Sequence, residues 1–242
     1  MTPIKILQSA ADTRPDWVSR CMTSVADWSK RLGYGYQCIG DELFDWVRPE
    51  LRAKLQDRTP ILADLARLRW IEAELSARDG LVVWIDADTL VVDPDWCVPD
   101  SEHTIFGEEC WVQPTAGGGW RAYQSPHNAF MGFTAASPVL GFLAYLSESI
   151  IERADEAHIA PQMVGPKLLK ALNNLAQFTL VPEAGAVSPE LLAEWVGEAG
   201  PATACYEQTA RAPLALVNLC SSLTHTGEAV QRVEQFLARY GV

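Results

Sequence analysis

The residues from Leu81 to Ile85 are all apolar, and the run ends abruptly at Asp86, Ala87 and Asp88. Because the run lacks polar alternation, it predicts a strand covered on both faces, at the centre of a mostly parallel sheet. An ionised carboxylate at the end of such a strand costs roughly several kcal/mol of desolvation unless it has a partner. The segment therefore predicts an α/β fold with functional residues where the central strand ends.

The segments before this run predict the rest of a βαβ unit. Residues 4–8 form a short apolar run typical of a first strand, and an amphipathic helix follows that ends at Gly33. Residues 34–39 then predict a second strand. The longest helical pattern covers residues 60–78 and leads directly into the central strand.

The second half is richer in Gly, Pro and aromatic residues. Residues 113–120 contain three consecutive glycines and predict a mobile loop without regular structure. With no internal repeat or polar linker, one domain over residues 1–242 is the simplest expectation. Further elements are expected as strands at 128–134 and 178–181 and helices at 138–154, 166–175 and 226–240.

Composition and charge narrow the class of protein. Hydrophobic residues make up 48% and charged residues 21%, as in ordinary globular proteins. The 19 basic against 31 acidic residues give a net charge of −12, which disfavours nucleic acid as a partner. No apolar stretch is long enough for a transmembrane segment or a signal peptide, so a cytoplasmic location is expected. The six scattered cysteines are expected to be free, buried thiols.

Asp86 and Asp88 form the first chemical motif. In an extended chain they project to the same side, with Cα atoms about 6.6 Å apart. Two carboxylates with few other protein ligands suit Mn²⁺ or Mg²⁺, which keep water or phosphate oxygens in the remaining positions. A solvated turn is the alternative interpretation, because Asp is common after strands.

Asp64 and Arg67 form the second motif. They lie three residues apart within the helix predicted at 60–78, so they share one face next to its apolar stripe. Together with the apolar run before Asp86, this polar pair favours a functional site over a solvated turn. The alternative is an ordinary ion pair within the helix, worth a few tenths of a kcal/mol, roughly.

Together these motifs resemble the DXD-containing sugar transferases, the group of glycosyltransferase family 32 with fungal Golgi α-mannosyltransferases and bacterial capsular-polysaccharide sugar transferases. The glucosylating bacterial toxins are more distant kin. The similarity covers roughly residues 3 to 175. The segments that carry it are Pro3–Gln8, Asp64 with Arg67, Val82–Asp88, Asn128–Met131 and Gly165–Pro166.

The resemblance implies a GT-A fold, with a nucleotide-binding half at residues 1–100 and an acceptor-side half at 101–242. It implies transfer of a sugar from a nucleoside-diphosphate sugar donor to a glycan or lipid-linked acceptor, with retention of anomeric configuration and a Mn²⁺ or Mg²⁺ cofactor. The biological setting would be polysaccharide biosynthesis, in the cytoplasm or at the inner face of the membrane.

The resemblance also assigns roles around the two acidic motifs. Asp88 would bind the metal directly, and Asp86 would contact ribose or sugar hydroxyls and the metal shell. Asp64 and Arg67 would hold the donor, with Arg67 also stabilising the leaving diphosphate.

Further roles fall on residues outside these motifs. Gln8 and Ser9 would line the nucleobase pocket, and Asn128 would face the transferred sugar or the acceptor. His225, just before the last predicted helix, matches the position of a late metal ligand in this fold, although a lone His is equally well a structural residue.

Two groups of residues in the second half of the sequence each have two possible interpretations. Trp111, Trp120 and Tyr123 flank the Gly-rich segment, where they suit either stacking on sugar or base or packing of a long loop. Glu108 and Glu109 either reach the acceptor or are exposed loop acids.

Two other functions use the same carboxylates. A haloacid-dehalogenase-like phosphatase also places such a motif after an apolar strand, with Asp86 as nucleophile. However, that family needs one residue between the second Asp and a Thr, whereas Thr89 follows Asp88 directly. The other alternative is a non-catalytic module that binds sugar nucleotides or a metal.

Overall fold

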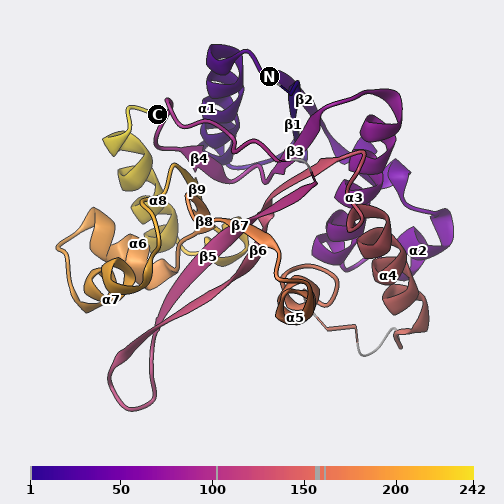
Figure 1. Ribbon diagram of the computed structural model, residues 1–242. Helices are drawn as coiled ribbons and strands as arrows, with labels where there is room; N and C mark the ends of the chain where they lie inside the picture. Colours follow the sequence, from indigo (N-terminus) through magenta and orange to yellow (C-terminus); the bar gives the residue numbers. More distant parts are fainter. Residues whose placement is uncertain (1, 102, 156–158, 161) are drawn as a thin grey trace.

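The computed structural model describes residues 2–101, 103–155, 159–160 and 162–242. Two sheets, flanked by helices, organise these residues (Figure 1). The strands are β1 (Ile4–Ser9), β2 (Gly35–Ile39), β3 (Leu81–Ile85), β4 (Thr89–Val91), β5 (Thr104–Pro114), β6 (Trp120–Thr134), β7 (Thr179–Val181), β8 (Ala184–Ala186) and β9 (Leu216–Asn218). The helices are α1 (Asp16–Leu32), η1 (Asp41–Trp46), α2 (Pro49–Lys54), α3 (Thr59–Ala77), α4 (Leu140–Arg153), α5 (Pro166–Ala176), α6 (Pro189–Val196), α7 (Pro201–Thr209), η3 (Ser221–Leu223) and α8 (Gly227–Arg239).

The larger sheet has the strand order β2-β1-β3-β6-β5-β7. Its β1–β2, β1–β3 and β5–β7 pairings are parallel, whereas β6 runs antiparallel to both β3 and β5. This is the expected α/β architecture with a mostly parallel central sheet between helices. The smaller sheet, β4-β9-β8, continues the chain directly after the acidic segment at 86–88.

Strand β3 lies inside the larger sheet and all five of its residues are buried, as the apolar run predicts. Val82 and Trp84 pack into the hydrophobic cluster that contains α3 and α4. Val83 and Ile85 pack on the opposite face, in the cluster that contains Val25 and Trp28 of α1. Because both faces are covered by helices, the strand carries no polar side chain until it ends.

The loop predicted at residues 113–120 is shorter than expected. Strands β5 and β6 extend to Pro114 and Trp120 and form a long hairpin that projects from the sheet (Figure 1). Only residues 115–119 form the turn, closed by a hydrogen bond from Thr115 N to Gly119 O (2.8 Å). The glycines correctly indicated a turn. The alternating residues on either side of it, which form the two strands, were not recognised in the sequence.

The other expected elements are confirmed to within a few residues, except that β6 begins at Trp120 and not at residue 128. The sequence did not predict β5, the short strands β4, β8 and β9, or the helices α2, α6 and α7. All six cysteines are free, but only Cys21 and Cys110 are buried. Among the described residues, no helix combines the length and apolar character needed to span a membrane.

Gly80 fixes the entry into β3. Its φ is +113°, and a Cβ atom there would lie 2.2 Å from the backbone oxygen of Pro3. We expect Gly80→Ala to lower the free energy of unfolding by more than about 2 kcal/mol, because both the backbone conformation and the contact are unfavourable. Urea unfolding measures this change.

Gly33→Ala is the matched control. Gly33 also has a positive φ of +73°, but a Cβ atom at this position would meet no other atom within 4 Å. The free energy of unfolding of Gly33→Ala should fall by only about 1 kcal/mol, which is the cost of placing an alanine in a left-handed conformation. Equal losses for the two variants would contradict a steric role for Gly80.

Candidate functional site

Three segments that are distant in the sequence meet where β3 ends. The end of β1 contributes Ser9, helix α3 contributes Arg67, and the segment after β3 contributes Asp86 and Asp88. These residues line a cavity of about 260 Å³. The first strand and the central strand are parallel neighbours, so their carboxyl ends open at the same edge of the sheet.

Arg67 organises the acidic side chains. It forms an ion pair with Asp64 one helical turn away, and its Nη1 donates to Asp86 Oδ1 (2.9 Å). The same nitrogen donates to the backbone oxygen of Asn128 in β6 (2.9 Å), and its guanidinium stacks over the Trp84 ring at 5.3 Å. Buried contacts on all sides fix the guanidinium, since the Arg67 side chain is only 8% exposed.

Only one of the two carboxylate oxygens of Asp86 accepts hydrogen bonds from the described residues. Oδ1 accepts hydrogen bonds from Arg67 and from Trp84 Nε1 (2.5 Å), whereas no described residue donates to Oδ2. Its side chain is 29% exposed, by far the most accessible of the three carboxylates. Oδ2 is therefore free to bind a ligand in the cavity.

Asp88 is buried and held by the second sheet. Oδ1 accepts from Asn218 Nδ2 (2.5 Å) at the end of β9, and Oδ2 accepts from the backbone N–H of Ser221 (2.7 Å). Cys220, between these two partners, has a left-handed backbone with φ of +50°. A strained residue next to a buried carboxylate is typical of functional sites.

Asp64 and Asn128 both contact Arg67 and are hydrogen-bonded to each other. Asn128 Nδ2 donates to Asp64 Oδ1 (2.8 Å), and both side chains are buried. Gln8 is also completely buried: its Nε2 donates to the backbone oxygen of Asp86 (3.2 Å), and its Oε1 accepts from Tyr36 (2.9 Å). Gln8 therefore positions the acidic segment, and Ser9 lines the cavity.

His225 lies apart from this cluster. Its side chain is exposed and does not line the cavity, and within the described part of the chain no three His, Cys, Asp or Glu residues form a metal-binding group. The same segment instead reaches Asp88 through the Ser221 backbone. Asn218, Ser221 and the Trp84 indole were missed by sequence reasoning, although Asn218 ends an apolar run much as Asp86 does.

The cluster carries excess negative charge. One guanidinium, that of Arg67, pairs with the carboxylates of Asp64 and Asp86, and the buried carboxylate of Asp88 adds a third negative charge next to Asp86. Burial raises the pKa of Asp64 to about 6, and the charge of Asp86 adds to this rise although Arg67 opposes it. Burial, followed by the charge of Asp86, also raises the pKa of Asp88. A bound cation would relieve this repulsion.

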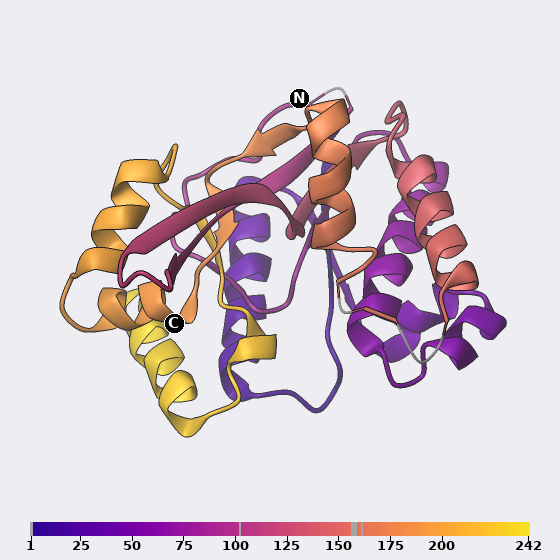
Figure 2. The ribbon, with the colours of Figure 1, turned by 90° about the horizontal axis from the view of Figure 1, so that it is seen from below.

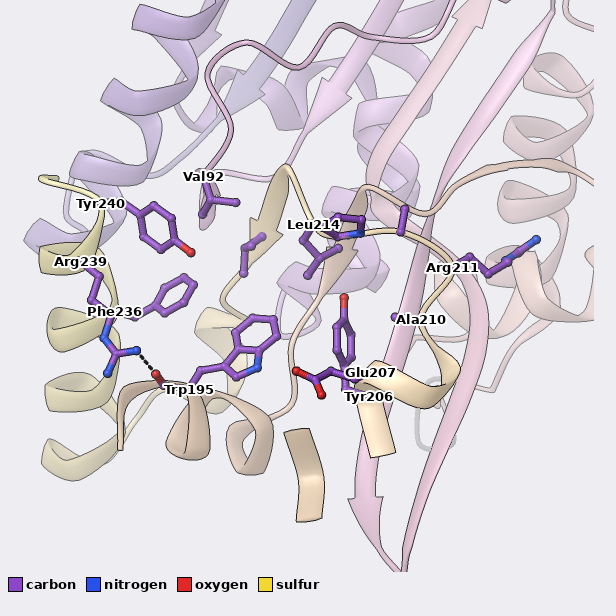
Figure 3. A pocket seen from close by; sticks show the side chains of 13 residues that line it. Val92, Trp195, Tyr206, Glu207, Ala210, Arg211, Leu214, Phe236, Arg239 and Tyr240 are labelled. Atoms are coloured by element: carbon purple, nitrogen blue, oxygen red, sulfur yellow. Dashed lines mark hydrogen bonds between the residues drawn. The ribbon is translucent and has the colours of Figure 1, made fainter. Parts of the chain in front are cut away.

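A second and larger cavity, of about 620 Å³, lies between α6, α7 and α8 (Figure 3). Its walls are mainly aromatic and apolar, and the Trp195 ring contacts the rings of both Tyr206 and Phe236. Arg239 at its edge donates to backbone oxygens at the end of α6. The cavity shares no lining residue with the acidic one, so we place the candidate site at the smaller, charged cavity.

The fold agrees with one comparison. The chain is similar to the crystal structure of a glycosyltransferase involved in the glycosylation of the major capsid of PBCV-1, with a TM-score of 0.50 and 12% identity over 97% of this chain and 99% of that chain. At this identity the similarity shows a shared glycosyltransferase fold of the GT-A type and no more. No protein-family model and no curated protein matches the sequence.

Asp64 makes the stability of the protein depend on pH. Its folded-state pKa of about 6 lies above the usual 3.8, so the folded state binds more protons between these values. Its contribution therefore destabilises the fold at neutral pH and recovers as pH falls. In Asp64→Asn, the rise in unfolding free energy from about pH 7.5 to about pH 5 should be smaller than in wild type.

Urea unfolding at both pH values, with a chelator present, measures this difference. Asp27→Asn, which changes an exposed carboxylate on α1, should keep the wild-type pH dependence. A pH dependence unchanged by Asp64→Asn would show that this carboxyl titrates normally.

Proposed function

We propose that this protein is a metal-dependent glycosyltransferase and that it belongs to the DXD-containing sugar transferases that its sequence resembles. It would move a sugar from a nucleoside-diphosphate sugar to a glycan or lipid-linked acceptor. The observation that carries the proposal is the excess negative charge of Asp64, Asp86 and Asp88, of which Arg67 pairs with the first two, at the edge of the sheet where α/β folds bind ligands. The shared fold supports the same conclusion.

The residues fit a Mn²⁺ or Mg²⁺ ion. Asp86 Oδ2 has no donor among the described residues, and Asp88 is a buried carboxylate whose pKa is raised by burial and by the charge of Asp86. Both ions prefer oxygen and accept a site with few protein ligands, because phosphate oxygens of the donor complete the shell. We assign Asp86 and Asp88 as the ligands, and the exposed His225 is not required.

The other side chains suit the rest of a donor. Ser9 and the neighbouring backbone at the end of β1 line the cavity on the side suited to the nucleoside. Arg67 is held rigidly, so it positions Asp86 toward the donor. Asp64 and Asn128 fix Arg67 from behind and act as positioning residues.

The chemistry follows from charge. Breaking the bond between the anomeric carbon and the phosphate leaves negative charge on the diphosphate, and a bound divalent cation stabilises that leaving group. Arg67 adds preorganised positive charge near it. Retention of anomeric configuration follows from the family resemblance. We also keep the division into a nucleotide-binding half at 1–100 and an acceptor-side half at 101–242.

The two alternative functions have less support. In the phosphatase alternative Asp86 would attack phosphorus, yet Thr89 directly follows Asp88 where that family needs an intervening residue, and the fold similarity is to a glycosyltransferase. A module that only binds a sugar nucleotide would use the same carboxylates, and turnover of the donor separates it from an enzyme.

Donor binding is tested by thermal shift. A panel of UDP-, GDP- and CMP-sugars, with and without Mn²⁺, should show one nucleotide class that raises Tm by several degrees only when the metal is present. Binding at a hundredfold excess over Kd stabilises by about 3 kcal/mol, so the shift is easily measured. No shift with any donor would contradict the proposal.

Asp88→Asn should abolish the metal-dependent shift and lower donor hydrolysis by at least about a hundredfold, since it removes a ligand charge but keeps the side-chain size. Asp27→Asn on α1 is the matched control and should behave as wild type in both measurements. Metal-dependent binding without hydrolysis or transfer would favour the non-catalytic module, and wild-type turnover in Asp88→Asn would exclude Asp88 as a ligand.

A further inference from the structure

The outer half of the β5–β6 hairpin has two different faces. Its register is continuous from the pair Gly107–His127 to the pair Pro114–Trp120, so residues two apart on one strand share a face. One face packs against α6 and α7, which lie beside the hairpin in both ribbon views (Figures 1 and 2). The residues of this packed face that join the adjacent hydrophobic cluster are Cys110, Val112, Trp120 and Ala122.

The opposite face is formed by different residues. Trp111 lies directly opposite Tyr123, and Gln113 lies opposite Arg121. Trp111 and Tyr123 are half-buried and lie outside the hydrophobic clusters of the described residues, while Gln113 and Arg121 are exposed. The Arg121 guanidinium stacks over the Tyr123 ring at 4.9 Å. We call these four residues the hairpin stripe. The sequence alone could not separate Trp111 and Tyr123 from Trp120, which belongs to the packed face.

The hairpin stripe leads back to the candidate site. The next pair on the same face is Glu109 and Ser125, joined by a hydrogen bond from Ser125 Oγ to Glu109 Oε1 (3.1 Å). His127 follows, with Nε2 3.7 Å from Glu109 Oε2. His127 lines a small pocket together with Thr89 and Asn218, and Asn218 donates to Asp88. The face therefore leads toward Asp88, which lines the acidic cavity.

Its chemistry suits a neutral, polyhydroxylated chain. Aromatic rings offer an apolar face to the C–H side of a sugar ring, and the Gln113 amide and the Arg121 guanidinium offer hydrogen bonds to hydroxyl groups. Successive pairs on one face lie about 7 Å apart, so the three pairs from Glu109 to Gln113 extend over about 14 Å. One Glu and one Arg balance in charge, which does not favour a polyanion in a protein of net charge −12.

We propose that the hairpin stripe, with Trp111 as its main stacking residue, binds the acceptor as an oligosaccharide chain whose end reaches the candidate site past Glu109. This inference rests on the proposed function, since it names the acceptor class and where it lies. The stripe gives the protein affinity for several sugar units in addition to the one that reacts. Longer acceptors should therefore bind more tightly than short ones.

The test compares the full chain with three variants on an immobilised array of neutral oligosaccharides of increasing length, with Mn²⁺ and nucleoside diphosphate present. Wild type should retain a set of glycans, and binding should strengthen with chain length. Trp111→Ala should weaken this binding by about ten-fold or more, and Trp111→Phe should restore part of it. Tyr145→Ala, which removes a 63% exposed aromatic ring on α4, should bind as wild type.

Donor hydrolysis and the thermal transition are measured on the same samples. A cooperative transition in Trp111→Ala shows that the variant is folded, and its donor hydrolysis without acceptor reports on the donor cavity, which Trp111 does not line. Equal glycan binding by Trp111→Ala and wild type, or retention of no glycan by a protein that hydrolyses a donor, would overturn the inference. Glycan binding that depends on Trp111 in a protein that binds no donor would support the stripe and refute the transferase.

Discussion

The Arg67 guanidinium is the contact on which the candidate site depends. It joins Asp64 on its own helix, Asp86 after the central strand and the backbone of Asn128 in the antiparallel neighbour of that strand. One side chain thus fixes three elements and partly neutralises a buried acidic cluster. A buried ion pair contributes little net stability, because desolvation offsets attraction. Its value here is geometric: it holds Asp86 with one oxygen committed and the other open to the cavity.

The second sheet completes the arrangement from the other side. Asp88 stands between the two sheets and takes its hydrogen bonds from Asn218 and Ser221, which arrive from near the C-terminal end of the chain. The two acidic residues of one short motif are therefore supported by different halves of the protein. This division gives them different environments, with Asp86 partly exposed and Asp88 buried. A cation bound between them would couple the two halves.

The hairpin illustrates how one supersecondary element can serve two purposes. Its packed face contributes Val112 and Trp120 to the core beside α6 and α7, and this packing makes the hairpin an extended, rigid arm. The free face then carries Trp111 and Tyr123 at a fixed spacing from Glu109. A mobile loop would lose conformational entropy on binding a ligand, whereas strands already hold their side chains in place. A platform for a long acceptor is better built on such an arm.

The sequence by itself determined the α/β class, the buried central strand and the presence of carboxylates at its end, because periodicity and desolvation act locally. It also paired Asp64 with Arg67, since both lie on one helix. It did not reveal that Gln8 donates to the Asp86 backbone, that Asn218 and Ser221 hold Asp88, or that His225 is exposed and outside the cavity lining. Nor did it reveal which face of the hairpin each tryptophan occupies. Those facts depend on contacts between distant segments and on strand register, which only the tertiary structure decides.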